Sequence, residues 1–80
     1  MANESVVIVE IKPSGSPDAD IYRGLHQCIK YEALIRAEQI LDGEKPDGTA
    51  ILVVGRPIPH VVADHARRLK VRLIADVKVK

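Results

Sequence analysis

Residues 5–12 read Ser-Val-Val-Ile-Val-Glu-Ile-Lys, and residues 49–54 read Thr-Ala-Ile-Leu-Val-Val. Both stretches are short, nearly continuous runs of aliphatic residues in which valine and isoleucine predominate. Such runs are typical of strands that are buried on both faces, as in parallel sheets. We therefore predict two buried strands, one at residues 5–12 and one at residues 49–54.

The segment between these two strands has the pattern of a helix. From residue 21 to residue 41, apolar residues recur at helical spacing on one face, namely at Leu25, Cys28, Ile29, Ala33, Ala37 and Ile40. Asp18 or Asp20 can cap the start of this helix. Gly43 can end it, because glycine adopts the left-handed C-terminal conformation without steric cost. We predict a helix over residues 21–41 and a loop over residues 44–48.

A second helix and a third strand follow. Pro59 suits the first turn of a helix that runs to about residue 69, with Val62, Ala66 and Leu69 facing inward. Residues 71–79 alternate between apolar and polar side chains, which predicts a half-exposed edge strand. The order is then βαβαβ. Helices that connect successive strands make parallel neighbours, so we predict a single α/β domain, residues 1–80, with a small, mostly parallel three-stranded sheet.

The first strand raises a question about strand order. In the order 1-2-3 it would have an open edge, and residues 5–12 contain no proline, bulge signal or clustered charge to protect it. Either the order is 2-1-3, or another polypeptide covers the edge. Three strands and two helices also give a thin core, so we expect a homodimer or a higher assembly.

Composition narrows the cellular setting. The chain of 80 residues has one cysteine, which allows no intrachain disulfide and fits a reducing compartment. The N-terminus does not resemble a signal peptide, and no apolar run approaches the roughly 20 residues that span a bilayer. We therefore expect a cytoplasmic protein without a membrane partner.

The two halves of the sequence differ in charge. Residues 49–80 hold seven Lys or Arg and two Asp or Glu, whereas residues 1–48 hold five and nine. The basic half either faces nucleic acid or is a solvated helix and tail. The chain has no Phe or Trp, which removes the usual base-stacking platforms of single-strand binders.

Two polar residues stand near the end of the first predicted strand. Glu10 and Lys12 are two residues apart, so their side chains leave the same face. Ligand sites in open parallel sheets gather at the carboxyl ends of strands. A carboxylate there can hold Mg²⁺, and a neighbouring ammonium can orient a water or stabilise phosphate charge. The same triplet is also a common way for a strand to end without any function.

The helix that follows carries Gln27 and Tyr31 four residues apart, and hence on one face. An apolar strand ending in Glu-Ile-Lys, a polar loop, and a helix with Gln-x-x-x-Tyr resemble the PD-(D/E)XK nuclease superfamily, particularly its RecB-type members. The resemblance covers residues 5–42 by motif and residues 49–76 by topology. It implies that the chain is similar to the C-terminal half of a restriction-endonuclease-like core.

The resemblance implies a role for each of these residues. Glu10 and the carbonyl of Ile11 would bind Mg²⁺, or Mn²⁺ as its substitute, and Lys12 would position the attacking water. Gln27 and Tyr31 would support the site or contact the nucleic-acid backbone. The reaction would be Mg²⁺-dependent phosphodiester hydrolysis.

One part of the family pattern has no counterpart here. The family's defining acidic residue lies on a strand before the Glu-x-Lys strand, and nine residues precede Glu10. We therefore expect the chain to be inactive alone unless a partner, an upstream segment, or Asp18 or Asp20 supplies that carboxylate. The alternatives are a non-catalytic α/β domain that self-assembles or binds nucleic acid, and an unrelated interaction domain.

Overall fold

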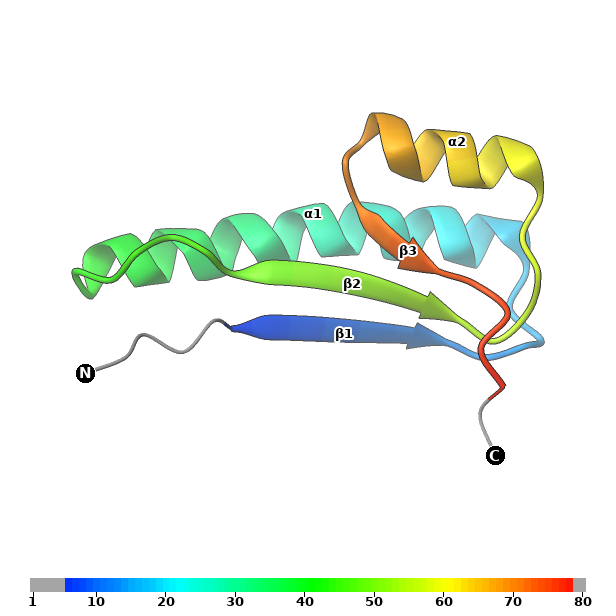
Figure 1. The fold of residues 1–80 in the computed structure, drawn as a ribbon, viewed down its shortest axis with the longest axis horizontal. Coiled ribbons are helices and arrows are strands. Elements are labelled where there is room, and N and C mark those ends of the chain that lie inside the picture. The colour runs from blue at the N-terminus through cyan, green and yellow to red at the C-terminus, as the bar shows by residue number, and fades with distance from the viewer. Residues whose placement is uncertain (1–5, 79–80) are drawn as a thin grey trace.

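The computed structural model describes residues 6–78. Its elements follow in the order β1 (Val7–Lys12), α1 (Asp18–Leu41), β2 (Thr49–Val54), α2 (His60–Arg68) and β3 (Arg72–Ile74). Both strand pairs are parallel, and the sheet order is β1-β2-β3 (Figure 1). The predicted βαβαβ layout is confirmed. Since β2 lies between its neighbours, β1 is an edge strand and the order 2-1-3 is excluded.

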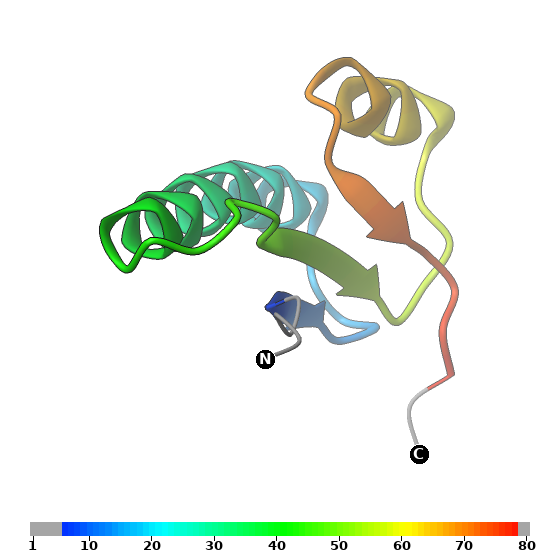
Figure 2. The same cartoon turned by 60° about the vertical axis from the view of Figure 1, so that its left-hand side comes forward.

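Both helices lie on the same face of the sheet (Figures 1 and 2). Two right-handed crossovers that proceed in one direction across a parallel sheet place their helices on one side. No element within residues 6–78 covers the other face, so the side chains of Val7, Val9 and Ile11 are 51%, 51% and 59% exposed. The prediction that the first strand is buried on both faces is therefore wrong. Ser5, its predicted first residue, lies outside the described residues.

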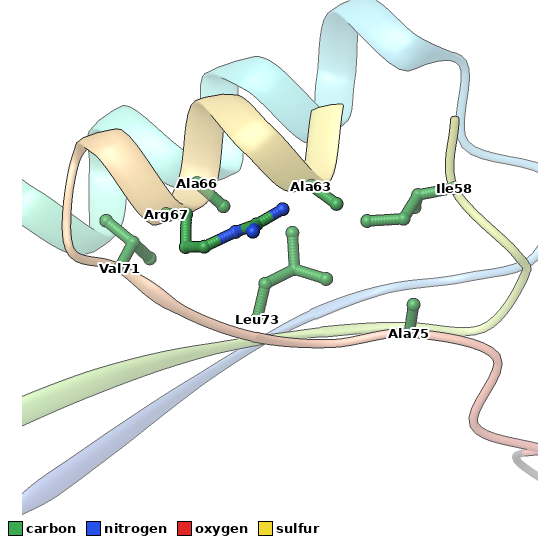
Figure 3. A pocket seen from close by; sticks show the side chains of 7 residues that line it. All are labelled: Ile58, Ala63, Ala66, Arg67, Val71, Leu73 and Ala75. Carbon is green, nitrogen blue, oxygen red and sulfur yellow. The ribbon is translucent and has the colours of Figure 1, made fainter. Parts of the chain in front are cut away.

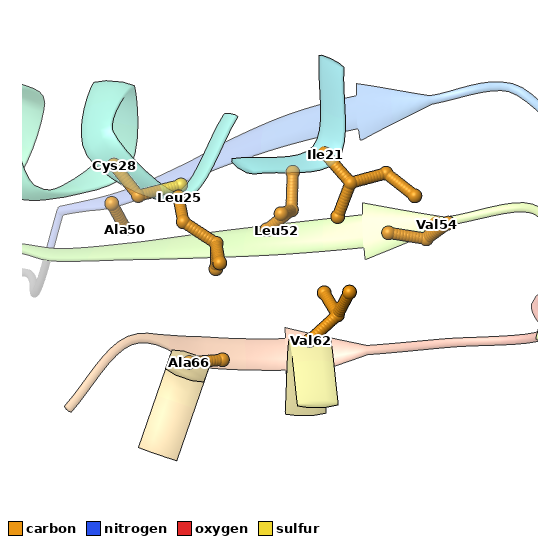
Figure 4. Packing of buried hydrophobic residues seen from close by; sticks show 8 residues of the cluster. All are labelled: Ile21, Leu25, Cys28, Ala50, Leu52, Val54, Val62 and Ala66. Carbon is orange, nitrogen blue, oxygen red and sulfur yellow. The ribbon is translucent and has the colours of Figure 1, made fainter. Parts of the chain in front are cut away.

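The core lies between the sheet and the two helices (Figure 4). β2 is the central strand and sends the side chains of Ala50, Leu52 and Val54 into it. The other buried apolar residues come from both helices and are Ile21, Leu25, Cys28, Val62 and Ala66. The inward positions predicted for α2 are confirmed, with Leu69 half-buried against the same cluster.

α1 differs from its prediction at both ends. It begins at Asp18 after the N-cap residue Pro17, and no side chain caps it. Asp18 and Asp20 lie in the first turn, where carboxylates interact favourably with the helix dipole, so neither is the predicted N-cap. The other end extends past the starts of β1 and β2 (Figure 1). The side of α1 that faces the sheet and the loop after the helix carries Leu25, Cys28, Ile35 and Gln39. Ile29, Ala33, Ala37 and Ile40 lie beside this face and are exposed, contrary to the predicted apolar face.

The end of α1 and the loop that returns to the sheet are held by specific hydrogen bonds. Gly43 adopts φ 76°, as predicted, and the Glu44 N–H donates to the Gln39 carbonyl at 2.7 Å. The buried Gln39 side chain then accepts from the Gly48 N–H at 2.9 Å. Arg36 Nε donates to the Gly48 carbonyl at 2.8 Å. This loop thereby brings the chain directly to the start of β2.

The last strand is shorter than residues 71–79, where it was predicted. β3 ends at Ile74, because Asp76 adopts φ 59° and turns the chain out of the regular ladder. The segment stays attached, since the Val77 N–H donates to the Val54 carbonyl at 3.1 Å. Val79 lies outside the described residues. Within residues 6–78, neither helix has the length and apolar character that crossing a membrane requires.

Candidate functional site

Glu10 and Lys12 lie on the side of β1 that faces α1. Side chains alternate along a strand, and the even-numbered residues of β1 are partly buried while the odd-numbered ones are exposed. Lys12 Nζ lies 3.9 Å from Glu10 Oε1, with the two side chains 18% and 28% exposed. The carboxyl and amino groups of the pair are therefore close together and still reachable by solvent.

A glycine on α1 makes room for this pair. A Cβ atom on Gly24 would lie 3.1 Å from Lys12 Cε and 3.0 Å from Leu52 Cδ1. The aliphatic stem of Lys12 thus packs against the helix at Gly24, while its ammonium stays near Glu10. The requirement for a glycine at position 24 is not evident from the sequence. It follows from the close approach of α1 to the side chains of β1 and β2.

The charge of Glu10 also reaches α1. Burial, followed by the negative charges of Glu10 and Glu32, raises the pKa of the Cys28 thiol. Cys28 lies one turn beyond Gly24, so the carboxylate of Glu10 faces this part of the helix. The buried thiol is a core residue and stays protonated beside these two carboxylates.

Gln27 and Tyr31 flank Cys28 on α1, and both are half-buried. Gln27 Oε1 is buried and accepts no hydrogen bond from any residue in the described part of the chain. A buried acceptor without a donor costs about 1–3 kcal/mol. Within residues 6–78 no hydrogen bond joins Gln27 or Tyr31 to Glu10 or Lys12. Gln27 therefore presents an unused acceptor on the helix that covers the pair.

The backbone carbonyl of Ile11 points to the open edge of the sheet and not toward β2. The Lys12 carbonyl accepts from the Gly55 N–H at 2.9 Å, and the Val6 carbonyl accepts from the Thr49 N–H at 2.9 Å. Because backbone groups alternate in direction along a strand, those of Val7, Val9 and Ile11 point away from β2. The Ile11 carbonyl lies at the open edge, one residue from the Glu10 carboxylate.

The oxygen donors that the described residues place at this edge are fewer than a metal ion requires. Mg²⁺ takes about six oxygen ligands, usually one or two carboxylates with waters and phosphate oxygens. Glu10 and the Ile11 carbonyl supply part of such a set. Nowhere in residues 6–78 do three His, Cys, Asp or Glu side chains gather as metal ligands. Asp18 instead pairs with Arg56 at 2.6 Å, and Asp20 with Arg23 at 3.4 Å.

Comparison of the chain with protein-family models, with characterised proteins and with solved structures gave no match. The site is therefore interpreted from its own geometry.

A pocket of about 420 Å³ lies just beyond the carboxyl ends of β1 and β2, lined by Pro13, Ser14, Gly55, Val77 and Lys78. Its position fits the rule that ligands bind beyond the carboxyl ends of parallel strands. Glu10, Lys12, Gln27 and Tyr31 do not line it. Lys12 and Pro13 are adjacent in the sequence, so the charged pair and this pocket occupy neighbouring parts of the same end of the sheet.

A second pocket, of about 360 Å³, lies between α2 and β3 (Figure 3). Its walls are apolar except for Arg67, whose side chain extends across it. Arg67 is also paired with Asp64 on the same helix. This pocket offers no group for acid, base or metal chemistry, and it is a gap where a short helix meets an edge strand.

Proposed function

We propose that this protein is a nuclease-like module of the PD-(D/E)XK type that acts on phosphodiester bonds when a partner completes its metal site. The observation that carries the proposal is the Glu10–Lys12 pair, 3.9 Å apart on the α1-facing side of β1. The Ile11 carbonyl at the open edge and the unused acceptor of Gln27 on α1 support it.

Each residue has a distinct part in the proposed chemistry. Glu10 and the Ile11 carbonyl would hold Mg²⁺, which supplies Lewis-acid stabilisation of phosphate charge. Lys12 keeps its ammonium beside the carboxylate and would orient a water for in-line attack. Gln27 and Tyr31 would contact the nucleic-acid backbone from α1. With one carboxylate at this edge, we expect no cleavage by the isolated chain.

The proposed setting follows from charge and cysteine content. Nucleic acid is the proposed partner, since Lys and Arg outnumber acidic residues seven to two in residues 49–80. A single buried thiol suits the reducing cytoplasm, which we propose as the location.

Calorimetric titration with Mn²⁺ and with Mg²⁺ tests the metal site. We expect weak binding by the wild-type chain, and a loss of roughly tenfold or more in Glu10→Gln, because the only carboxylate ligand is removed. Glu38→Gln is the matched control, since the Glu38 side chain is exposed on α1 and makes no ion pair or hydrogen bond within residues 6–78. Equal metal affinity in the wild type, Glu10→Gln and Glu38→Gln would remove the proposal.

A second candidate function is self-assembly, and the uncovered face of the sheet favours it. Across this face the register aligns Val9 with Ile51, and Ile11 with Val53 and Ile74. These side chains form apolar rows next to the outward-pointing backbone groups of β1, which pair with no residue in the described part of the chain. Exposed apolar patches beside an open strand edge are typical of interaction surfaces.

A second copy fits this edge in one simple way. If two β1 strands pair antiparallel about a two-fold axis at Val9, Val7 of each copy lies opposite Ile11 of the other. The backbone groups that point outward would then bond between copies, and no like charges would lie opposite each other. This pairing uses the Ile11 carbonyl, so it competes with metal binding at the same edge.

A further inference from the structure

A groove opens where β2 extends beyond the start of β3, at the end of the sheet opposite the Glu10–Lys12 pair. β3 begins opposite Ile51, so Thr49 and Ala50 of β2 have no partner on β3. The gap is bordered by the middle of α1 and by the turn from α2 to β3. It has a volume of about 520 Å³, within the range of small-molecule sites.

The walls of this groove combine apolar side chains with positive charge. Ile29 and Leu69 contribute apolar surface, and Arg36 and Lys70 contribute cations. Arg72 is aligned with Ile51, so its side chain borders the groove from the uncovered face of the sheet. The one carboxylate in the lining, Glu32, is already engaged. Its Oε1 accepts from the Ala50 N–H at 3.3 Å and lies 3.8 Å from Arg36 Nη2.

Lys70 and Arg72 are the unpaired charges of the groove. Within the described residues neither side chain makes a hydrogen bond or an ion pair, and both are exposed. Arg36 differs, because its guanidinium is held by the Gly48 carbonyl and by Glu32. The side chains of Lys70 and Arg72 are therefore available to bind an anion.

The conformation of Lys70 is a second sign that its position matters. The Val71 N–H donates to the Ala66 carbonyl at 3.0 Å and the Lys70 N–H to the Arg67 carbonyl at 3.1 Å. These bonds form the same helix-ending motif that uses Gly43 at the end of α1. Lys70 has φ 58°, a left-handed conformation that disfavours side chains. A strained residue on a groove wall is a candidate for function.

We propose that this groove binds a phosphate ester of mononucleotide size. Its phosphate would lie on Lys70 and Arg72, and its apolar part would lie on Ile29 and Leu69. A free nucleotide and one unit of a nucleic-acid strand share this chemistry. The site needs no metal and lies apart from Glu10, so it stands or falls independently of the nuclease-like site.

NMR titration of the full chain in EDTA tests the proposal with AMP, adenosine, inorganic phosphate and a short single-stranded oligonucleotide. We expect AMP to shift the amide resonances of residues 69–72 and Ala50, and adenosine to leave them unchanged. A charge-assisted hydrogen bond predicts that Arg72→Gln weakens AMP binding roughly tenfold. Arg68→Gln, an exposed cation outside the groove lining, should bind AMP as the wild type does.

Comparison of the probes identifies the source of the phosphate ester. Tighter binding of the oligonucleotide than of AMP assigns the groove to a strand, and equal binding assigns it to a free nucleotide. AMP that shifts no groove resonance overturns the proposal. So does an Arg68→Gln variant that loses as much affinity as Arg72→Gln.

Lys70→Gly separates ligand binding from folding. Relief of the left-handed strain should raise the Tm by about 4–8 °C, while loss of the ammonium should weaken AMP binding roughly tenfold. A more stable protein with weaker binding is the expected combination. Unchanged AMP affinity in Lys70→Gly would contradict the role of Lys70.

Discussion

Cys28 is the residue at which the core meets the candidate metal site. Its side chain is 1% exposed, and burial together with the charges of Glu10 and Glu32 raises the pKa of its thiol. A raised pKa means that the folded protein keeps the proton at a pH where the unfolded chain has lost it. The stability that this thiol contributes is therefore fully present below the unfolded-state pKa and is lost as the pH rises through the folded-state pKa.

Glu10→Gln should lower the pKa of Cys28, because it removes one of the two negative charges that disfavour the thiolate. The ¹³Cβ chemical shift of Cys28, followed against pH, measures this pKa directly. Glu38→Gln serves as the control and should leave the titration midpoint where it is in the wild type. A midpoint that does not move in Glu10→Gln would show that the carboxylate lies too far from the thiol.

Some of the candidate site follows from local geometry, and some does not. Two-residue periodicity was enough to place Glu10 and Lys12 on one face of β1. Gly24 and Lys70 could not be recognised, because their meaning depends on a strand packing against the helix and on a left-handed helix end. A sequence shows which residues share a face but not how closely two elements approach.

Among the elements, the return loop between α1 and β2 depends most on one residue. A Cβ atom on Gly48 would lie 2.3 Å from Ile35 Cγ2, closer than packed atoms allow. The backbone of Gly48 is also fixed on both sides, by Gln39 and by Arg36. A side chain at this position would separate the loop from α1 and break these hydrogen bonds.

We expect Gly48→Ala to lower the free energy of unfolding by about 1–3 kcal/mol, the usual cost of overpacking. Gly15→Ala is the matched control, since no atom lies within 4 Å of the Cβ that it would add. Urea denaturation of both variants gives the comparison. If Gly48→Ala is as stable as Gly15→Ala, the loop does not pack against α1 as described.

The order and type of the elements were predictable, because aliphatic runs and helical spacing are strong local signals. The inner face of α1 was predictable over its first half, where Leu25 and Cys28 are buried. The prediction was wrong over the second half, where Ile35 and Gln39 lie on the buried side and Ala37 and Ile40 are exposed. Periodicity shows which residues share a face of the helix. A face becomes buried only where another part of the chain packs against it.

The molecule as a whole is one-sided. Both helices cover one face of the sheet, and the opposite face presents Val9, Ile11 and Ile74, which are 51%, 59% and 46% exposed. A sheet with an open edge and an apolar face gains stability when a second polypeptide covers it. Strand order and helix placement, which local sequence patterns do not determine, therefore decide which face of the sheet stays exposed.

A self-assembled protein should have a mass near twice 8.8 kDa in light scattering at micromolar concentration. Val9→Lys should shift it to the monomer, because it places like charges beside each other at the two-fold axis of the proposed strand pairing. Val61→Lys is the control, because Val61 is 64% exposed on α2, which packs against β3 and α1 and not against β1. A wild-type mass near 8.8 kDa with a cooperative thermal transition would contradict self-assembly.

The most direct test of the nuclease-like site is to locate bound Mn²⁺ by the broadening that it causes in the amide spectrum of the full chain. We predict that broadening centres on Glu10, Ile11 and Lys12, extends to Gln27 and Tyr31, and disappears in Glu10→Gln. Broadening that centres on the acidic loop at residues 42–47, or that persists unchanged in Glu10→Gln, would contradict the proposed site.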